Sequence, residues 1–239
     1  MDVLRIRDWY RTPQGRVVRR VLRGPVQGLL PNGDDSHVLG LGYTLPYLRE
    51  QEENRNCFTA MPGKMGVTHW PENMPNRSLL CWEDQLPFPD NTFDYIFVAH
   101  ALEFTGSPEV LLESCWRVLR PEGRLLVMVP NRAGLWSHRE TTPLGRGHPY
   151  SSHELHKLLR HGNFMMTQSF YALHVPPTNR RWLLQTYETW EKAGTRWWAP
   201  TGGVLFMEGR KDVYGMRAVR SAKPHPKPVT VKPAAAWDY

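Results

Sequence analysis

Several features are scarce in this 239-residue sequence, and each absence narrows the class of protein. No run of about 18 consecutive apolar residues occurs, so we expect no membrane-spanning helix. The first 20 residues lack the apolar core of a secretory signal. The three cysteines, Cys57, Cys81 and Cys115, are odd in number and widely spaced, which favours free thiols over a disulfide framework. A reducing compartment is therefore expected, by default the cytoplasm.

Charge is unevenly distributed along the chain, whose formal net charge is +7. Residues 1–23 hold seven arginines against Asp2 and Asp8, and residues 207–239 also carry an excess of positive charge. Basic ends of this kind are compatible with nucleic acid, an anionic membrane or an acidic protein partner, but they also occur as plain solvated surface. Charge alone therefore leaves the partner open, and it does not indicate an oligomeric state.

Short apolar runs alternate with helical patterns through most of the chain. Strands are expected over 37–42, 57–61, 77–82, 95–99, 124–130 and 164–173 and from residue 202 onward, and helices over 7–30, after Pro46, and over 107–119, 151–161 and 182–190. This alternation predicts an α/β fold with a mainly parallel sheet covered on both faces. We divide the chain into a basic helical extension (1–35), the α/β domain (36–220) and a disordered Pro/Lys-rich tail (221–239).

Two linked motifs point to a family. "LPFPDNTFDYIFVAHALEF" (86–104), followed by "VLLESCWRVLRPEGRLLVMVPN" (110–131), resembles the second half of a class I S-adenosylmethionine-dependent methyltransferase of the small-molecule type. The resemblance covers roughly residues 36–212 and is strongest over 83–131. It implies a Rossmann-like, seven-stranded sheet whose last strand is antiparallel, S-adenosylmethionine as the cofactor, and methyl transfer as the activity.

The glycine-rich cofactor turn of this family is altered in "HVLGLGYTLPYL" (37–48). Gly40 stands where the family has an acid, Gly42 matches the first glycine, and Thr44 and Pro46 replace the other two. Met61 falls near the place of the acid that holds the ribose. The resemblance therefore implies a cofactor site with weakened binding, and we expect its residues to be Gly40, Gly42, Tyr43, Met61, Glu83 and Asp84.

Methyl transfer needs an aligned nucleophile and often a base that takes its proton. His100 and Glu103 directly follow the strand at 95–99, beside the expected place of the methyl group, and are the candidate catalytic residues. The loop over 131–150 and the N-terminal helix supply candidate substrate-binding residues: Tyr10, Arg132, His148 and Tyr150. We expect the N-terminal helix to cover the cofactor side of the sheet, with Asp8, Trp9 and Tyr10 facing inward. No residue cluster has metal-ligand spacing, so no metal is expected.

These observations predict a methyltransferase that modifies an oxygen or nitrogen atom of an unidentified polar substrate of small or medium size. The alternative is a methyltransferase-fold protein with little or no activity that serves as a binding or assembly module, because fold does not imply function. Nucleic acid is a disfavoured substrate, since "AHALEF" (99–104) departs from the [D/N/S]-P-P-[F/Y/W] motif of family members that methylate exocyclic amines.

Overall fold

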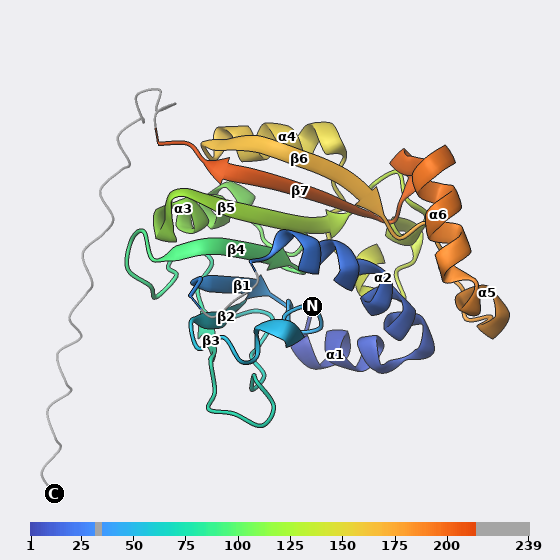
Figure 1. Ribbon diagram of the computed structural model, residues 1–239, viewed down its shortest axis with the longest axis horizontal. Helices are drawn as coiled ribbons and strands as arrows, with labels where there is room; N and C mark the ends of the chain where they lie inside the picture. Colours follow the sequence, from blue (N-terminus) through green and yellow to red (C-terminus); the bar gives the residue numbers. More distant parts are fainter. Residues whose placement is uncertain (32–34, 214–239) are drawn as a thin grey trace, which may run out of the picture.

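Seven strands form a single twisted sheet in the computed structural model, which describes residues 1–31 and 35–213 (Figure 1). The strands are β1 (Val38–Gly42), β2 (Cys57–Pro62), β3 (Ser78–Cys81), β4 (Phe93–Ala99), β5 (Leu119–Pro130), β6 (Phe164–Ala172) and β7 (Val204–Lys211). The α-helices are α1 (Val3–Arg11), α2 (Pro13–Leu29), α3 (Pro108–Val118), α4 (Ser152–His161), α5 (Arg181–Gln185) and α6 (Tyr187–Trp197). Short 3-10 helices are η1 (Arg49–Gln51), η2 (Leu135–His138), η3 (Pro143–Gly145) and η4 (Ala199–Thr201). The tail predicted from residue 221 lies outside the described residues.

The strand order is β3-β2-β1-β4-β5-β7-β6. Strands β1 to β5 pair in parallel, and β7 pairs antiparallel with both β5 and β6. The predicted Rossmann-like, seven-stranded sheet with an antiparallel last strand is therefore confirmed. Because Gly42 is in register with Ala99, and Pro62 with Cys81, the carboxyl ends of β1 to β4 share one edge of the sheet. Their arrowheads point toward α1 in Figure 1.

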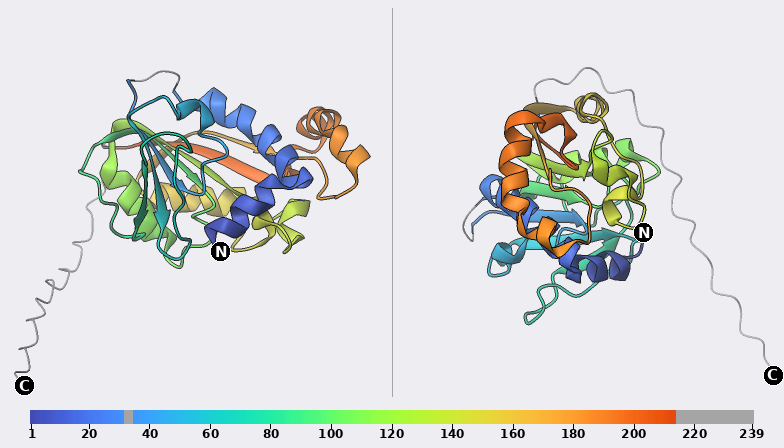
Figure 2. Two further views of the ribbon diagram at one scale, coloured as in Figure 1. Left: turned by 90° about the horizontal axis from the view of Figure 1, so that it is seen from below. Right: turned by 90° about the vertical axis from the view of Figure 1, so that its right-hand side faces the viewer.

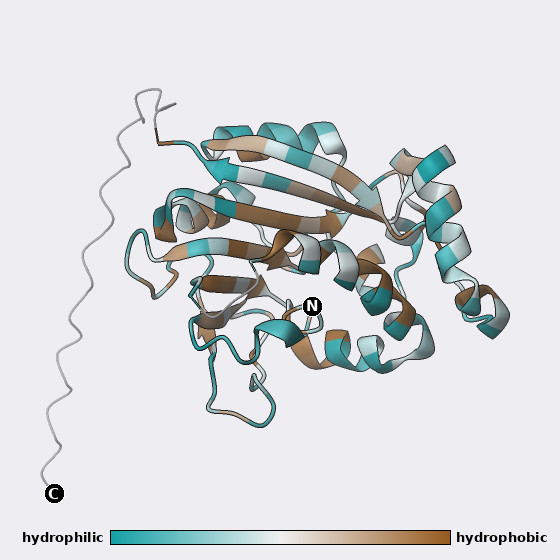
Figure 3. Ribbon diagram, in the orientation of Figure 1, coloured by the Kyte–Doolittle hydropathy of each residue, from teal (hydrophilic) through white to brown (hydrophobic). Residues whose placement is uncertain are grey.

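Helices cover both faces of the sheet, as the left-hand view of Figure 2 shows. One face packs against α2, whose Val18, Leu22 and Val26 are completely buried. The other face packs against α3 and α4, which bury Leu111 and Leu155 among others. Brown strands enclosed by helices with teal outer surfaces show this layering in Figure 3. The α-helices therefore keep their polar sides in water and bury narrow apolar stripes.

The prediction of a helix after Pro46 is wrong. Residues 43–48 form turns, and only the three residues of η1 are helical before β2 begins. The face that such a helix would cover is already filled, because Tyr47 and Leu48 are buried in the same apolar cluster as α2. Helix α2, which precedes β1 in the sequence, thus takes the place that the pattern assigned to a following helix.

Other local signals are confirmed. Helix α4 begins with a capping box, in which the Ser151 hydroxyl accepts the Glu154 amide and the Glu154 carboxylate accepts the Ser151 amide. The helix ends at His161, directly before Gly162, as expected. All three cysteines are unpaired and buried, and burial raises the pKa of the Cys57 and Cys115 thiols to about 12. These thiols are therefore structural and unreactive.

Asp94 ties the start of β4 to two other segments. Its carboxylate accepts the His37 backbone amide at 2.9 Å and two hydrogen bonds from Arg120 at 2.7 and 2.9 Å. Burial pushes the pKa of Asp94 upward, but the His37 amide and the Arg120 guanidinium outweigh it and hold the pKa below its usual value of 3.8.

Asp94→Asn is therefore expected to lower the free energy of unfolding by about 1–2 kcal/mol at neutral pH. A depressed carboxyl pKa stabilises the fold above the unfolded-state value, and this contribution disappears as the pH falls through the folded-state value. The difference between variant and wild type should accordingly shrink between about pH 5 and pH 3 in urea unfolding curves. Asp90→Asn is the matched control, because Asp90 makes only an exposed pair with Arg117. Equal losses of unfolding free energy in both variants would contradict the stabilising role assigned to the Asp94 carboxylate.

Candidate active site

The predicted turn residues lie where the carboxyl ends of β1 and β4 meet. Gly42, the last residue of β1, has a φ of +84°, and a Cβ placed on it would collide with the Ala99 carbonyl oxygen. Gly40 lies inside the same strand, and a side chain there would collide with the Thr44 hydroxyl. Both glycines are thus required by close packing within the chain itself.

Met61 lies next to the last residue of β2, and the acidic pair Glu83 and Asp84 follows β3. Met61 is completely buried in the apolar cluster beneath α2, and cannot itself accept a hydrogen bond from a ribose hydroxyl as a carboxylate would. Glu83 follows β3 and its carboxylate accepts the Thr105 hydroxyl, which links the loops after β3 and β4. Asp84 is exposed beside it. The structure thus separates Met61, inside the core, from Glu83 and Asp84, outside it.

Four polar side chains form a buried chain of hydrogen bonds across the sheet edge. The Tyr10 hydroxyl lies 2.7 Å from the Tyr47 hydroxyl and 2.7 Å from His100 Nε2. His100 Nδ1 lies 3.1 Å from the Glu103 carboxylate. All four residues are less than 4 % exposed. The two predicted catalytic residues are therefore brought together, with Tyr10, one of the predicted substrate contacts.

The partners of His100 assign its protons. A carboxylate can only accept, so Nδ1 is assigned the hydrogen that faces Glu103, and in that tautomer Nε2 accepts from the Tyr10 hydroxyl. Tyr10 then accepts from Tyr47. Burial, with the neighbouring Tyr47, raises the pKa of Tyr10 well above its usual value, which keeps its hydroxyl protonated. The result is a polarised ring whose Nε2 lone pair is occupied by the chain's own tyrosine.

Helix α1 holds that tyrosine in place. The Val3 amide donates to the Met65 carbonyl at 2.8 Å, and the Tyr10 ring stacks on Tyr43 with centroids 5.8 Å apart. The expectation that the N-terminal helix covers this side of the sheet is confirmed for Tyr10. It is wrong for Asp8, whose side chain is 63 % exposed and pairs with Arg7, because the helix turns that residue outward.

The remaining predicted substrate contacts gather elsewhere. Arg132 binds Glu154 at 2.6 Å and His148 Nε2 at 3.1 Å, and the rings of His148 and Tyr150 meet edge to face. The Tyr150 hydroxyl donates to the Leu102 carbonyl at 3.2 Å. Arg132, His148 and Tyr150 therefore support the loop behind Glu103. The hydrogen bonds just described join them to one another, to Glu154 and to the Leu102 carbonyl, and none of these bonds reaches Tyr10.

Comparison with known proteins agrees with this architecture. Residues 40–127 match the family model described as a methyltransferase domain. The ubiquinone/menaquinone biosynthesis C-methyltransferase UbiE of Paraburkholderia phytofirmans is 47% identical over 51 residues, which are 21% of this chain and 21% of that protein. The same enzyme of an Enterobacter strain is 38% identical over 82 residues, 34% of this chain and 30% of the relative. The chain thus aligns with only about a fifth to a third of the length of these curated relatives.

Solved structures match over most of the chain. A methyltransferase of Thermotoga maritima, described as a possible histamine N-methyltransferase, superposes with a TM-score of 0.61 at 17% identity, over 86% of this chain and 94% of its own. A methyltransferase of Aquifex aeolicus gives 0.55 at 15% identity, over 88% and 99%. Residues 40–127 thus match a methyltransferase domain, and the described residues have the fold of class I S-adenosylmethionine-dependent methyltransferases. The cofactor of these methyltransferases is S-adenosylmethionine.

Two features of this edge depart from what that cofactor needs beside His100. Gly42 packs directly against Ala99 and Ala101, and Tyr10 fills the space beside His100. Met61 offers no ribose acceptor. The Nε2 side of His100 is therefore closed by Tyr10, and a cofactor methyl group could reach it only after the Tyr10 side chain has moved.

Sequence reasoning missed the role of Tyr47. Tyr47 falls in the segment expected to be helical after Pro46, and no local signal connects it to Tyr10, which is 37 residues away. Thr44, which replaces a glycine of the turn, is completely buried, and its hydroxyl has no partner among the described residues. Within residues 1–31 and 35–213, no group of three or more histidine, cysteine, aspartate or glutamate side chains could hold a metal. Over the same residues, no helix is long and apolar enough to cross a membrane.

Proposed function

We propose that this protein transfers the methyl group of S-adenosylmethionine to an oxygen or nitrogen atom of a polar substrate of small or medium size. The observation that supports the proposal is the His100–Glu103 pair at the carboxyl end of β4, next to Gly42. Ligands of open α/β sheets bind at this edge. The curated relatives are named as C-methyltransferases, but they match too short a stretch to carry their substrate over.

Each member of the pair has a distinct task. Glu103 accepts the Nδ1 hydrogen and fixes the ring, and its second oxygen has no hydrogen-bond partner. With Nδ1 held, the Nε2 lone pair is the basic atom of the site once Tyr10 releases it. His100 would then take the proton from an attacking hydroxyl or amine, and a fixed carboxylate behind the ring stabilises the charged form.

A calorimetric titration with S-adenosylmethionine tests cofactor binding. Wild-type protein is expected to bind at micromolar concentration or more weakly, because binding must break the Tyr10 hydrogen bonds. Tyr10→Phe removes both bonds while keeping the ring, so its affinity should rise by about tenfold. Tyr171→Phe, on β6 and outside the chain of hydrogen bonds, is the matched control and should leave affinity unchanged. A weaker Tyr10→Phe complex would mean that the hydroxyl holds the ligand.

The second candidate function is a binding or assembly module without methyl transfer. The specific observation in its favour is the buried Tyr10–His100 contact, which fills the cofactor edge with the chain's own side chain. The same titration separates the two candidates. If neither wild type nor Tyr10→Phe binds S-adenosylmethionine at about millimolar concentration, the enzyme proposal fails and the module remains.

A further inference from the structure

A cleft of about 540 Å³ opens between α1, α2 and the loops that follow β1 and β2. Arg7 and Arg11 line it from α1, one helical turn apart, and Arg19 lines it from α2. Tyr43 and Trp70 supply aromatic surface. The cleft therefore joins a cationic wall to planar apolar side chains.

Hydrogen-bond donors in the cleft lack partners. The Arg7 side chain pairs with Asp8, but in the described part of the chain the side chains of Arg11 and Arg19 make neither a hydrogen bond nor an ion pair. Trp70 is only 4% exposed, and its buried Nε1–H has no acceptor. A buried N–H without an acceptor is costly unless a ligand supplies one. The cleft thus offers two arginine side chains without partners, and the tryptophan in its lining has a buried N–H without an acceptor.

Tyr43 lines the same cleft as the three arginines and is affected by their charge. Burial raises the pKa of Tyr43 to about 12, and Arg7, Arg11 and Arg19 all act on that pKa in the opposite direction. The hydroxyl of Tyr43 makes no hydrogen bond among the described residues, so it adds one more donor that faces the cationic wall.

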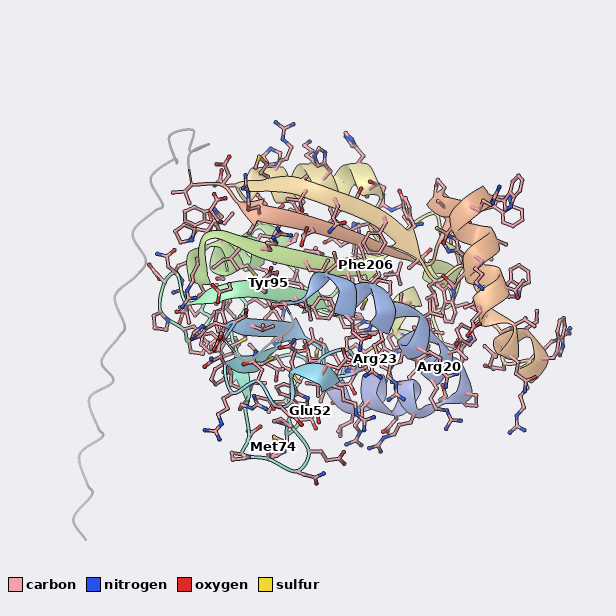
Figure 4. All side chains as sticks on the ribbon, in the orientation of Figure 1. Arg20, Arg23, Glu52, Met74, Tyr95 and Phe206 are labelled. Atoms are coloured by element: carbon pink, nitrogen blue, oxygen red, sulfur yellow. The ribbon has the colours of Figure 1, made fainter. Side chains whose placement is uncertain are left out.

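The loops after β1 and β2 add Glu52, Glu72 and His69 to the lining of the cleft. Glu52, labelled in Figure 4, lies beside α1. No ion pair within 4.0 Å joins either carboxylate to a cleft arginine among the described residues. Three guanidiniums face two carboxylates, and the excess of positive charge lies on the helix side, where the unpaired arginines are.

We propose that this cleft binds a small organic anion, in which a phosphate or carboxylate group faces Arg11 and Arg19 and a planar body lies against Tyr43 and Trp70. Guanidinium groups favour such anions because their forked donors match both oxygens of the group. The Tyr10 ring lines the cleft while its hydroxyl binds His100, so the anion site adjoins the candidate base. The idea that this anion is the methyl acceptor rests on the proposed function. The existence of the anion site does not depend on the proposed function.

Calorimetric titration with phenyl phosphate, without cofactor, tests the site. Benzoate replaces the phosphate by a carboxylate, and benzyl alcohol is the neutral counterpart. We expect phenyl phosphate to bind with a Kd of about a millimolar or less, benzoate to bind more weakly or similarly, and benzyl alcohol not to bind. The double variant Arg11→Gln/Arg19→Gln should lose about tenfold or more in affinity for phenyl phosphate.

The matched control is Arg5→Gln/Arg16→Gln. Arg5 and Arg16 lie on the same two helices, are exposed and do not line the cleft. Replacing them by glutamine lowers the net charge by the same amount as Arg11→Gln/Arg19→Gln does. Its affinity for phenyl phosphate should stay within about threefold of wild type. Equal losses in the two double variants, equal binding of benzyl alcohol, or no binding to the wild type at about 10 mM would each overturn the proposal. Since no cofactor is present, these results are independent of methyl transfer.

Discussion

Gly42→Val is expected to lower the free energy of unfolding by about 4 kcal/mol or more, enough to unfold a protein of ordinary stability. Gly42 has a φ of +84°, which a β-branched residue adopts only at considerable cost. The new side chain would also collide with the Ala99 carbonyl and the Ala101 Cβ. Since these atoms belong to the end of β4 and its loop, neither can withdraw without opening the centre of the sheet.

Gly24→Ala is the matched control for this variant. Gly24 lies within α2, and a Cβ there would meet nothing within 4 Å. Alanine is favoured over glycine in a helix, but a Cβ on the residue before Pro25 is disfavoured in the helical conformation, so this variant should stay within about 1 kcal/mol of wild type. Urea unfolding followed by far-UV circular dichroism measures both effects. A loss below about 1 kcal/mol in Gly42→Val would show that the turn tolerates a side chain and that the packing argument is wrong.

The packing at Gly42 changes how the turn is understood. The sequence suggests that a valine there would close the turn to the cofactor, and that Met61→Glu would restore a ribose acceptor. The structure shows that both positions belong to the core: Gly42 packs on Ala99, and Met61 is completely buried under α2. A glutamate at Met61 would bury an unpaired charge, so we expect destabilisation in place of tighter binding.

The sheet and the His100–Glu103 pair could be predicted because their signals are local. Each strand is a short apolar run, and "FDYIFVAHALE" (93–103) places both residues directly after β4. By contrast, the contact between Tyr10 and His100 spans 90 residues. The sequence predicts that Tyr10 faces inward, but no pattern in α1 identifies His100 as its partner. Likewise, the cleft draws Arg19 and Trp70 from segments that are adjacent only after α2 has docked on the sheet.

The wrong prediction of a helix after Pro46 also arises from contacts between distant parts of the chain. Proline at a first helical position is a sound local signal, but a helix also needs an apolar surface on which to pack. Here α2 had already taken that surface, with Val18, Leu22 and Val26 completely buried. Which of two candidate segments covers a face is decided by tertiary packing, and a single sequence carries little information about it.

His100→Gly is expected to reduce turnover by about a hundredfold or more, if His100 is the base of the methyl-transfer reaction. The variant suits the backbone, because His100 has a φ of +54° and glycine adopts this conformation without strain. It also leaves a space lined by the Glu103 carboxylate and the Tyr10 hydroxyl, the two groups that hold the imidazole ring. Release of S-adenosylhomocysteine, measured with a panel of hydroxyl- and amine-bearing acceptors, reports the turnover.

Added imidazole separates a chemical role from a structural one. Free imidazole can enter the space left by the side chain, where Glu103 accepts one N–H and the other nitrogen faces the acceptor, so turnover of His100→Gly should recover in part. His153→Ala, an exposed histidine on α4, is the control and should keep wild-type turnover with or without imidazole. A His100→Gly protein that keeps wild-type turnover would remove His100 from the chemistry. One that loses turnover, stays folded and gains nothing from imidazole would show that His100 positions the edge and moves no proton.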